Sequence, residues 1–581
     1  MKALINQFSI VLLTALFAAS SAAQDTPLAT ATTRTLKFPA DQRVGVVELF
    51  ASSNLEEQRD EEPELVPAFG SVQVATNQFA SLKVGGVEDL QFLDRLPATG
   101  LQQIEVRGLS IDRKAVGHLT RFGGLQELSL NECRIDDDAF DDAPKLDKLQ
   151  RLNVSTEDKV KRHLNSMATW ISRLPLLDFL YAKPALDAIA IGKVKGHSSL
   201  KTITIDVQKD REAIIFKMIS ELPAITGLIV SVDEDVSPRA LDRLASVPNL
   251  ELLTLVRAKV DGELLKNIGR IGTVRSLRFL VITPGEGFLE GLKSIPSIEN
   301  LTLQTMPWEN AEAEREFQKN LPLTLLDLPN IKDLPDMRNL DAITLRRIFD
   351  MPNIESLRIS GLAKGVDVEI LSGLQKLTRL KTLGLSLVPL DDDDLQMLDG
   401  LENLEYLSLD NTKITGIGFA YLKDLPKLGR MTIMMNTRQA KPNLRGLASL
   451  KNLNRIQVFG YGFEPKDFYP IADCRSLRHV VLSEGTIDDS VAARFSRMPN
   501  LRSLNWFDST ISDHGASDLA KLSQLQSLSV AGDITAEGVK EFVKLPNLTS
   551  IFIRSSKLSE ADKQELPRFF PAVSRIGFRD Q

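Results

Sequence analysis

Cysteine is nearly absent from this 581-residue sequence, which has only Cys133 and Cys474. A chain of this size with so few cysteines does not depend on a framework of disulfides. Tryptophan occurs three times, whereas hydrophobic residues make up 43% of the chain and charged residues 25%. This composition is that of an ordinary folded protein, so an extended apolar core must supply the stability.

Histidine is scarce, and neither sign of charge is in large excess. The five histidines are scattered, and none stands at metal-ligand spacing from another histidine or a cysteine, so we predict no metal centre. The 70 basic and 77 acidic residues leave a net charge of -7, with no long basic tract. Because binding to a phosphate backbone depends on clustered cations, this balance argues against nucleic acid as a partner.

Patterns that mark cofactor loops or catalytic nucleophiles are incomplete. The glycines Gly285, Gly287 and Gly291 follow an apolar strand, but their spacing differs by one residue from that of a dinucleotide-binding loop. Ser198 and Lys201 match SxxK without its companion motifs. The sequence therefore predicts no cofactor and no catalytic residues, and we expect the protein not to be an enzyme.

Long hydrophobic runs are also missing. Ile10 to Ala19 is apolar but shorter than the roughly 20 residues that span a bilayer. Lys2 precedes this run and Ser21-Ala22-Ala23 follows it, as in a secretory signal peptide. We predict a signal peptide over residues 1–23, cleavage after Ala23, and a secreted or periplasmic protein with no membrane span.

The pattern LxxLxL recurs along most of the chain. From Ile354 to Val573 its copies begin 23 to 26 residues apart, and looser copies extend back to Phe79. The earlier copies begin at Phe79, Leu101, Leu125, Leu149, Leu177, Leu200, Ile225, Leu250, Leu277, Ile298 and Leu323, and the later ones at Ile354, Leu380, Leu404, Leu428, Leu453, Leu477, Leu501, Leu525, Leu548 and Val573. Such a period indicates a repeat array in which LxL places two apolar side chains on one face of a short strand.

The segment from Leu401 to Leu425, LENLEYLSLDNTKITGIGFAYLKDL, is the clearest copy. On these residues the chain resembles the leucine-rich-repeat family, in the variant that reads LxxLxxLxLxxTxITDxGLxxLxxL. The resemblance implies an α/β solenoid, a horseshoe with a concave parallel β-sheet and convex helices. It covers residues 76–581 as about 20 coils. Without the Cys-rich caps of the animal and plant members, we expect a secreted bacterial type.

The two cysteines can be placed in the repeat. Cys133 stands eight residues after Leu125, where Thr412 and Ser509 stand in their own copies, so a buried small side chain is predicted there. About 14 coils at about 4.8 Å each separate it from Cys474. We therefore expect both thiols to stay unpaired.

Two regions depart from the repeat. Residues 24–75 contain strand-like segments separated by the acidic segment NLEEQRDEEPELVP, and we predict a linker and a small β cap that covers the first coil. Residues 306–351 contain an acidic helical run, ENAEAEREF, and a long step between copies. A longer insertion or a kink is expected there, and the two remain open.

Polar residues follow the apolar residue that ends each strand segment, where they can cap the next helix. They are Asp136, Asp261, Asp391, Thr415, Asp488, Ser512 and Ser559. The acidic runs Asp136–Asp138 and Asp391–Asp394 begin at such positions, and the helix dipole explains them. Calcium binding remains an alternative, although no EF-hand spacing accompanies the runs.

These observations favour an extracytoplasmic scaffold that binds a protein or another macromolecule through its concave sheet. Two alternatives stay open: a structural component of the cell envelope or matrix, and an enzyme-associated effector. Side chains between and just after the strand leucines point away from the core. In the C-terminal half they form a predicted binding patch of Met434, Phe459, Val481, Asn505, Phe507, Phe552 and Arg554.

Overall fold

The computed structural model describes residues 33–579 except 41–42, 52–54, 56–57, 59–62, 76–77, 157–162, 184–185, 208–211, 233–243, 248, 307–310, 437–440, 571–572 and 574. The predicted signal peptide therefore lies outside the described residues. The described chain forms two compact units. We call them the central unit, which comprises the described residues of Lys37–Pro39 and Ser81–Arg379, and the terminal unit, which comprises the described residues of 33–36, Ala40–Ala80 and Leu380–Gln581.

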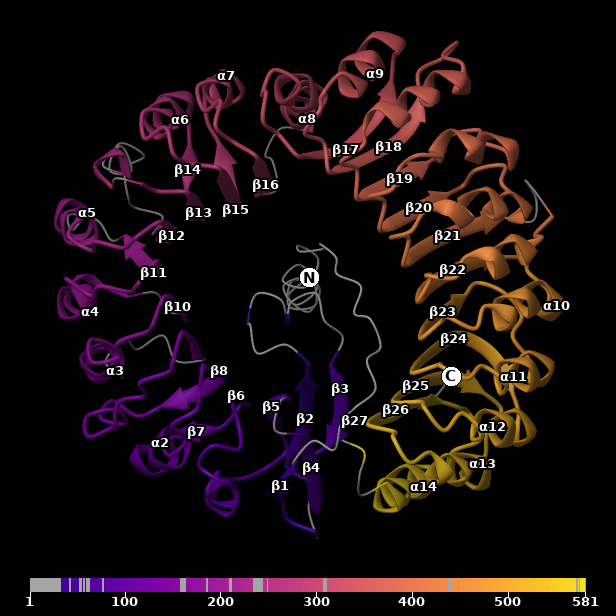
Figure 1. Cartoon of the computed structure of the whole chain (residues 1–581), viewed down its shortest axis with the longest axis horizontal. Coiled ribbons are helices and arrows are strands. Elements are labelled where there is room, and N and C mark those ends of the chain that lie inside the picture. Colours follow the sequence, from indigo (N-terminus) through magenta and orange to yellow (C-terminus); the bar gives the residue numbers. More distant parts are fainter. Residues whose placement is uncertain are drawn as a thin grey trace. The chain divides into compact units, whose positions relative to one another are not determined.

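Parallel strands, one in each coil, form the framework of the central unit (Figure 1). In each pair the residue of one coil lies opposite its counterpart in the next, as Leu128 does opposite Leu152. The strands are β6 (Gln103–Arg107), β8 (Glu127–Ile135), β9 (Arg151–Thr156), β10 (Phe179–Lys183), β11 (Thr202–Val207), β12 (Gly227–Val232), β13 (Leu252–Val256), β15 (Ser276–Pro284), β16 (Asn300–Thr305), β17 (Asp333–Leu340) and β18 (Ser356–Leu362). The short strands β7 (Ser110–Ile111) and β14 (Lys259–Val260) pair with β8 and β15.

Helices return the chain from one strand to the next. In the central unit they are η2 (Gln91–Arg95), α2 (Arg113–Thr120), α3 (His163–Ile171), α4 (Ala188–Val194), α5 (Glu212–Ser220), α6 (Gly262–Gly269), α7 (Phe288–Lys293), α8 (Ala311–Leu325), α9 (Ala342–Phe349) and η4 (Val368–Lys376). They bury one face, as α6 does with Leu264, Leu265 and Ile268. This spacing is that of an amphipathic helix packed on a sheet.

The terminal unit repeats the same plan with shorter, mostly 3₁₀ connections. Its parallel strands are β19 (Thr382–Ser386), β20 (Tyr406–Asp410), β21 (Arg430–Asn436), β22 (Arg455–Tyr461), β23 (His479–Ser483), β24 (Ser503–Ile511), β25 (Ser527–Gly532), β26 (Ser550–Arg554) and β27 (Arg575–Arg579). Its helices are η5 (Asp393–Leu398), η6 (Ile417–Asp424), η7 (Leu444–Ser449), α10 (Pro465–Phe468), η8 (Tyr469–Asp473), α11 (Asp489–Phe495), α12 (Asp513–Leu519), α13 (Ala536–Glu541), η9 (Phe542–Lys544), α14 (Glu560–Glu565) and η10 (Leu566–Phe569).

The predicted register of the later copies is confirmed. Each copy from Leu380 to Val573 is followed two residues later by the first residue of a strand. Two earlier positions were wrong. Leu277 is the second apolar residue of its coil, because β15 begins at Ser276 and the buried residue that opens the copy is Val274. Leu323 lies inside α8, so the copy opens at the buried Ile331.

The irregular stretch at residues 306–351 contains an insertion. Helix α8 has 15 residues, and it moves the next copy to Ile331, 33 residues after Ile298. Strand β16 ends one sheet and β17 begins another. Backbone hydrogen bonding between neighbouring coils nevertheless continues across the insertion, since the Lys332 amide donates to the Glu299 carbonyl at 2.7 Å.

Four short strands precede the repeats. They are β1 (Thr33–Lys37), β2 (Gly45–Phe50), β3 (Glu64–Pro67) and β4 (Ser71–Ala75), with β2 and β3 antiparallel and β1 paired with β4. Strand β3 lies at the end of the acidic segment, where the sequence indicated no strand. Phe50 and Leu55 form a buried cluster with Phe79, the first residue of β5 (Phe79–Val84).

Candidate binding surface

Side chains of the terminal strands alternate between a buried side and a side that faces away from the helices. In β20 Leu407 and Leu409 are buried, whereas Tyr406, Ser408 and Asp410, which alternate with them, are partly exposed. This alternation follows from the pleat of a strand. We call the side opposite the helices the inner face and the helix side the outer side (Figure 1).

The structure places all seven predicted patch residues on terminal strands, at inner-face positions. Met434 lies directly opposite Phe459 on the neighbouring strand, and Val481 lies opposite Asn505. Met434, Phe459 and Val481 are half-buried, and Phe507 has 42% of its surface exposed. Neighbouring strands thus bring the four apolar side chains of β21–β24 into one area.

Phe552 and Arg554 belong to β26, farther along the sheet. Phe552 lies over Gly577 of the last strand, because a Cβ on that glycine would come within 2.5 Å of the ring. Arg554 lies opposite Ala531 on one side and Arg579 on the other. The patch therefore has two parts, the apolar area on β21–β24 and this pair on β26.

Polar contacts fix the edge of the apolar area. The Asn411 amide donates to the Asp410 carboxylate at 2.7 Å and to the Met434 sulfur at 3.8 Å. The Asp410 carboxylate also accepts a hydrogen bond of 3.0 Å from the Ser386 hydroxyl. Asn411 has a φ of 49°, a left-handed conformation that asparagine adopts more readily than most residues.

The sequence reasoning missed the basic residues beside this apolar area. Arg430 lies opposite Arg455, which lies opposite His479, at the first positions of β21, β22 and β23. Arg478 and Arg502 come directly before β23 and β24. Aligning the copies by their first leucine would have shown this column, because all five residues follow such a leucine by one or two positions.

On the outer side, an aspartate of one coil holds the first turn of the next. Asp489 accepts hydrogen bonds from the Ser512 amide and hydroxyl and from the Gly515 amide, at 2.6–3.1 Å. Asp392 does the same for Thr415, Gly416 and Gly418. A Cβ at Gly515 or Gly418 would approach atoms of these aspartates to 2.3 Å, so the close contact requires glycine.

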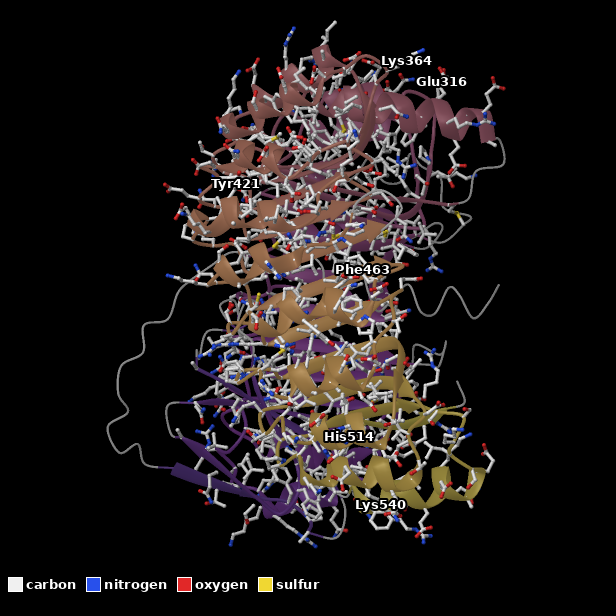
Figure 2. All side chains as sticks on the ribbon, turned by 90° about the vertical axis from the view of Figure 1, so that its right-hand side faces the viewer. Glu316, Lys364, Tyr421, Phe463, His514 and Lys540 are labelled. Atoms are coloured by element: carbon white, nitrogen blue, oxygen red, sulfur yellow. The ribbon has the colours of Figure 1, made fainter. Side chains whose placement is uncertain are left out.

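These contacts account for the TxITDxGL part of the repeat, and the paired strands account for LxxLxL. The chain folds as a leucine-rich-repeat solenoid. Its repeated carboxylates act across coils, so the solenoid is stabilised on the outer side by neighbour-to-neighbour contacts. Figure 2 shows this side of the terminal unit, with Tyr421 of η6 and His514 of α12 at its surface.

Solved structures with leucine-rich repeats resemble the chain at low identity. An internalin of Listeria monocytogenes is 16% identical with a TM-score of 0.29, over 63% of this chain and 83% of its own. A leucine-rich-repeat protein of Leptospira interrogans is 14% identical with a TM-score of 0.28, over 83% and 97%. The TLR13–ssRNA13 complex is 16% identical with a TM-score of 0.42, over 86% and 77%. No family model and no curated protein matches the chain.

The predicted helix caps are largely confirmed in this leucine-rich-repeat solenoid. Asp261, Asp488, Ser512 and Ser559 each accept a hydrogen bond from a first-turn amide. Asp391 accepts from the amides of residues 393 and 394. Asp136 is wrong as a helix cap, since only turns follow it. At η6 the cap position is Gly416, the Thr415 hydroxyl accepts from the Ile417 amide at 3.5 Å, and Asp392 accepts from the Gly416 amide at 3.0 Å.

The acidic runs have partners within the protein. Arg113 pairs with Asp138, Asp141 and Asp142 at 2.9–3.4 Å. In the second run the Asp393 carboxylate accepts from the Tyr421 hydroxyl at 3.1 Å, which raises the pKa of Tyr421. Across the residues that the structure describes, no three His, Cys, Asp or Glu side chains are grouped to hold a metal ion.

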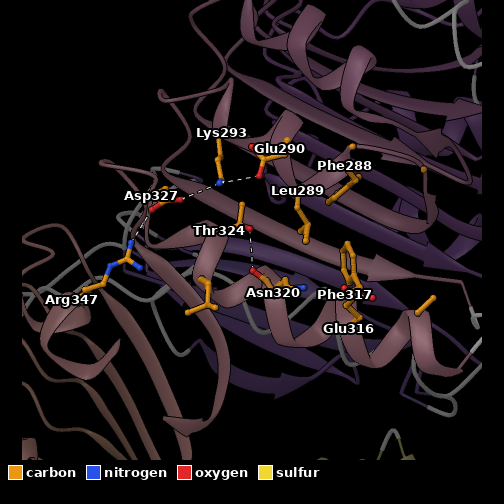
Figure 3. A pocket seen from close by; sticks show the side chains of 14 residues that line it. Phe288, Leu289, Glu290, Lys293, Glu316, Phe317, Asn320, Thr324, Asp327 and Arg347 are labelled. Atoms are coloured by element: carbon orange, nitrogen blue, oxygen red, sulfur yellow. Dashed lines mark hydrogen bonds and ion pairs between the residues drawn. The ribbon is translucent and has the colours of Figure 1, made fainter. Parts of the chain in front are cut away.

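A cavity of about 710 Å³ lies in the central unit beside the inserted helix (Figure 3). Its floor includes Phe288 and Phe317, whose rings are 5.6 Å apart. At its rim Lys293 pairs with Glu290 and Asp327, and Asp327 pairs with Arg347. These ion pairs join α7, the turn after α8, and α9, so the rim residues hold the insertion in the array.

Both cysteines are free and buried. Burial raises the pKa of each thiol, and that of Cys474 to about 12. Cys133 occupies the predicted position, fully buried like Ser509. Thiols in such surroundings are poor nucleophiles. None of the described helices is both long enough and apolar enough to cross a membrane.

Proposed function

We propose that this protein is an exported, non-enzymatic scaffold that binds a protein or another envelope macromolecule on the inner face of its terminal unit. The observation that carries the proposal is the apolar area on β21–β24, where Met434, Phe459, Val481 and the exposed Phe507 occupy inner-face positions of four successive strands. Exposed apolar side chains grouped on a rigid sheet and bordered by polar residues are typical of binding surfaces.

The proposal includes the processing and organisation that the sequence predicts. Residues 1–23 are removed, residues 24–75 form a linker and cap, and residues 76–581 form the repeat array of a secreted or periplasmic bacterial protein. The contact of Phe50 with Phe79, at 6.2 Å between ring centroids, supports a cap on the first coil. The exclusion of nucleic acid and of enzymatic activity stays a prediction based on charge and motifs.

The experiment is affinity capture from culture supernatant and envelope extracts with the mature protein as bait. A double variant, Phe459→Ser with Phe507→Ser, removes two apolar side chains from the inner face. Its matched control, Ile417→Ser with Val543→Ser, removes two outer-side residues that are 54% and 49% exposed. The inner variant should weaken binding of the captured partner by about 2 kcal/mol or more, and the control should not.

Thermal denaturation of both double variants separates binding from folding. We expect similar melting temperatures, because neither variant removes a fully buried side chain. A partner held equally well by the inner variant and the wild type would refute the binding surface. Light scattering that rises with concentration in the absence of partner would instead favour the envelope or matrix component that assembles through its lateral surfaces.

A further inference from the structure

The inner face of the terminal unit carries a column of cations. Arg430, Arg455 and His479 lie opposite one another on β21–β23, and Arg478 and Arg502 stand at the same edge of the sheet. Within the described part of the chain, no ion pair joins Arg430, Arg478 or Arg502 to a carboxylate. Adjacent like charges repel, and no ion pair with a described carboxylate offsets that repulsion at Arg430, Arg478 or Arg502.

The first coils of the central unit show the opposite arrangement. There Arg107 pairs with Glu132 at 2.9 Å, and Glu105 accepts from Asn131 at 3.0 Å. Glu127 accepts from Asn153 at 3.1 Å. Polar side chains on that inner face bond to one another across coils, whereas Arg430, Arg478 and Arg502 form no ion pair with a carboxylate among the described residues.

The distance between the column of cations and the apolar area indicates the size of a ligand that would contact both. From Arg455 to Phe459 is four residues, or about 13 Å along a strand at about 3.3 Å per residue. An α-helix is about 10–12 Å across. The four strands β21–β24 span about 14 Å at about 4.8 Å per step, close to the length of ten helical residues. Residues three or four apart on a helix follow one another at about the strand spacing.

We propose that β21–β24 bind an acidic amphipathic helix of a partner protein. The helix crosses the strands, with its carboxylates toward the arginine column and its apolar side chains on Met434, Phe459, Val481 and Phe507. This deepens the proposed function and rests on it. Carboxylates match the guanidinium donors by charge and geometry, and apolar contacts supply the burial.

A polyanion such as nucleic acid or an acidic polysaccharide would use the arginines alone. It would leave the apolar area uncovered, and that area borders the column over all four strands. A ligand with both carboxylate and apolar faces satisfies both features. The observations therefore favour a helical peptide over a polyanion.

The test uses the mature protein and a labelled synthetic peptide of about 14 residues, or about four helical turns. Glutamates occupy one flank of its helix and leucines the adjoining flank. Binding is measured by fluorescence anisotropy for wild type, for Arg430→Glu with Arg478→Glu, and for Arg445→Glu with Arg475→Glu. The last variant has the same change in net charge at exposed positions outside the column.

The proposal predicts that the Arg430/Arg478 variant binds the peptide about tenfold or more weakly and the Arg445/Arg475 variant within about twofold of wild type. A peptide with lysines in place of the glutamates should regain binding to the Arg430/Arg478 variant. Equal losses in both variants, or no binding of the glutamate peptide to wild type, would overturn it. So would heparin or single-stranded DNA binding at the column in place of the peptide.

The proposed function has a separate outcome. If the glutamate peptide fails while the Phe459/Phe507 variant still loses its captured partner, only the acidic-helix proposal falls. If that variant keeps its partner, the proposed binding surface itself is wrong.

Discussion

The two sides of the terminal unit use their polar residues differently. On the outer side, Asp392 and Asp489 give their carboxylate oxygens to the backbone and hydroxyl groups of the next coil. On the inner face, Arg430 and Arg478 form no ion pair with a carboxylate of the described residues. The same repeat thus separates residues that hold neighbouring coils in register from residues left available to a ligand. Substitutions on the two sides should therefore affect stability and binding separately.

Filling a close outer contact with backbone should have the largest effect. In Gly418→Ala the new methyl group would lie 2.3 Å from the Asp392 carbonyl oxygen, a backbone atom that can move only with its coil. We expect a loss of about 3 kcal/mol in the free energy of unfolding of the terminal unit. The measurement is the urea midpoint at which Cys474 becomes reactive in a Cys133→Ala background.

Gly123→Ala is the control for that substitution, because nothing lies within 4 Å of its added Cβ. It should leave the Cys474 midpoint unchanged. A Gly418→Ala protein as stable as wild type would show that the outer contacts do not fix the register.

Removing an outer-side carboxylate should have the second-largest effect on stability. Asp489→Ala deletes three hydrogen bonds to a charged group, and the Ser512 and Gly515 amides lose an acceptor. A destabilisation of about 2 kcal/mol is expected by the same thiol assay. Asp533→Ala removes an exposed carboxylate in the same unit and should change the midpoint little. If Asp489→Ala and Asp533→Ala had similar urea midpoints, the outer-side carboxylates would not stabilise the terminal unit as we propose.

Inner-face arginines should matter less for folding. Arg430→Ala and Arg478→Ala each remove an exposed cation from a column of like charges. We expect changes within about 0.5 kcal/mol in the free energy of unfolding. Urea denaturation that shows either variant destabilised by more than about 1 kcal/mol would mean that the column is part of the scaffold.

The ion-paired Glu299 of the central unit should make the free energy of unfolding depend slightly on pH. Hydrogen bonds from Lys332 and then Arg275 hold the pKa of Glu299 below its usual value of 4.5. A lowered folded-state pKa gives stability that is present above about pH 4.5 and is lost as pH falls through the folded value. The measurement is the urea midpoint at which Cys133 becomes reactive. In Glu299→Gln this midpoint should change less between about pH 4.5 and lower pH than it does in the wild type. An unchanged pH profile would contradict the assignment.

The regular coils could be predicted from sequence because a single period places every strand. Each start from Leu380 onward was placed correctly, since the apolar pair of LxL has one register that buries both side chains. Leu277 was misplaced because Val274, Leu277 and Phe279 offer two overlapping matches. Leu323 was misplaced because α8 supplies leucines of its own, and a helix buries them with a different period.

The binding surface was only partly predictable. Strand alternation placed Met434, Phe459 and Val481 on the inner face, yet the extent to which neighbours cover them depends on packing in adjacent coils. The stacking of Phe552 over Gly577 shows this, because it joins residues 25 positions apart. The arginine column was missed for a different reason. Arg430, Arg455, Arg478 and Arg502 are 23 to 25 residues apart in sequence and become neighbours only when the copies are aligned by their first leucine.

The most direct test of the inner face is a photo-crosslink to the captured partner. Gln457 lies on β22 between Arg455 and Phe459, and Lys423 is exposed on η6 of the outer side. With benzoylphenylalanine at either position, mass spectrometry locates the partner. The account predicts a crosslink from position 457, lost in the Phe459→Ser background, and none from position 423. A crosslink from position 423 without one from position 457 would contradict it.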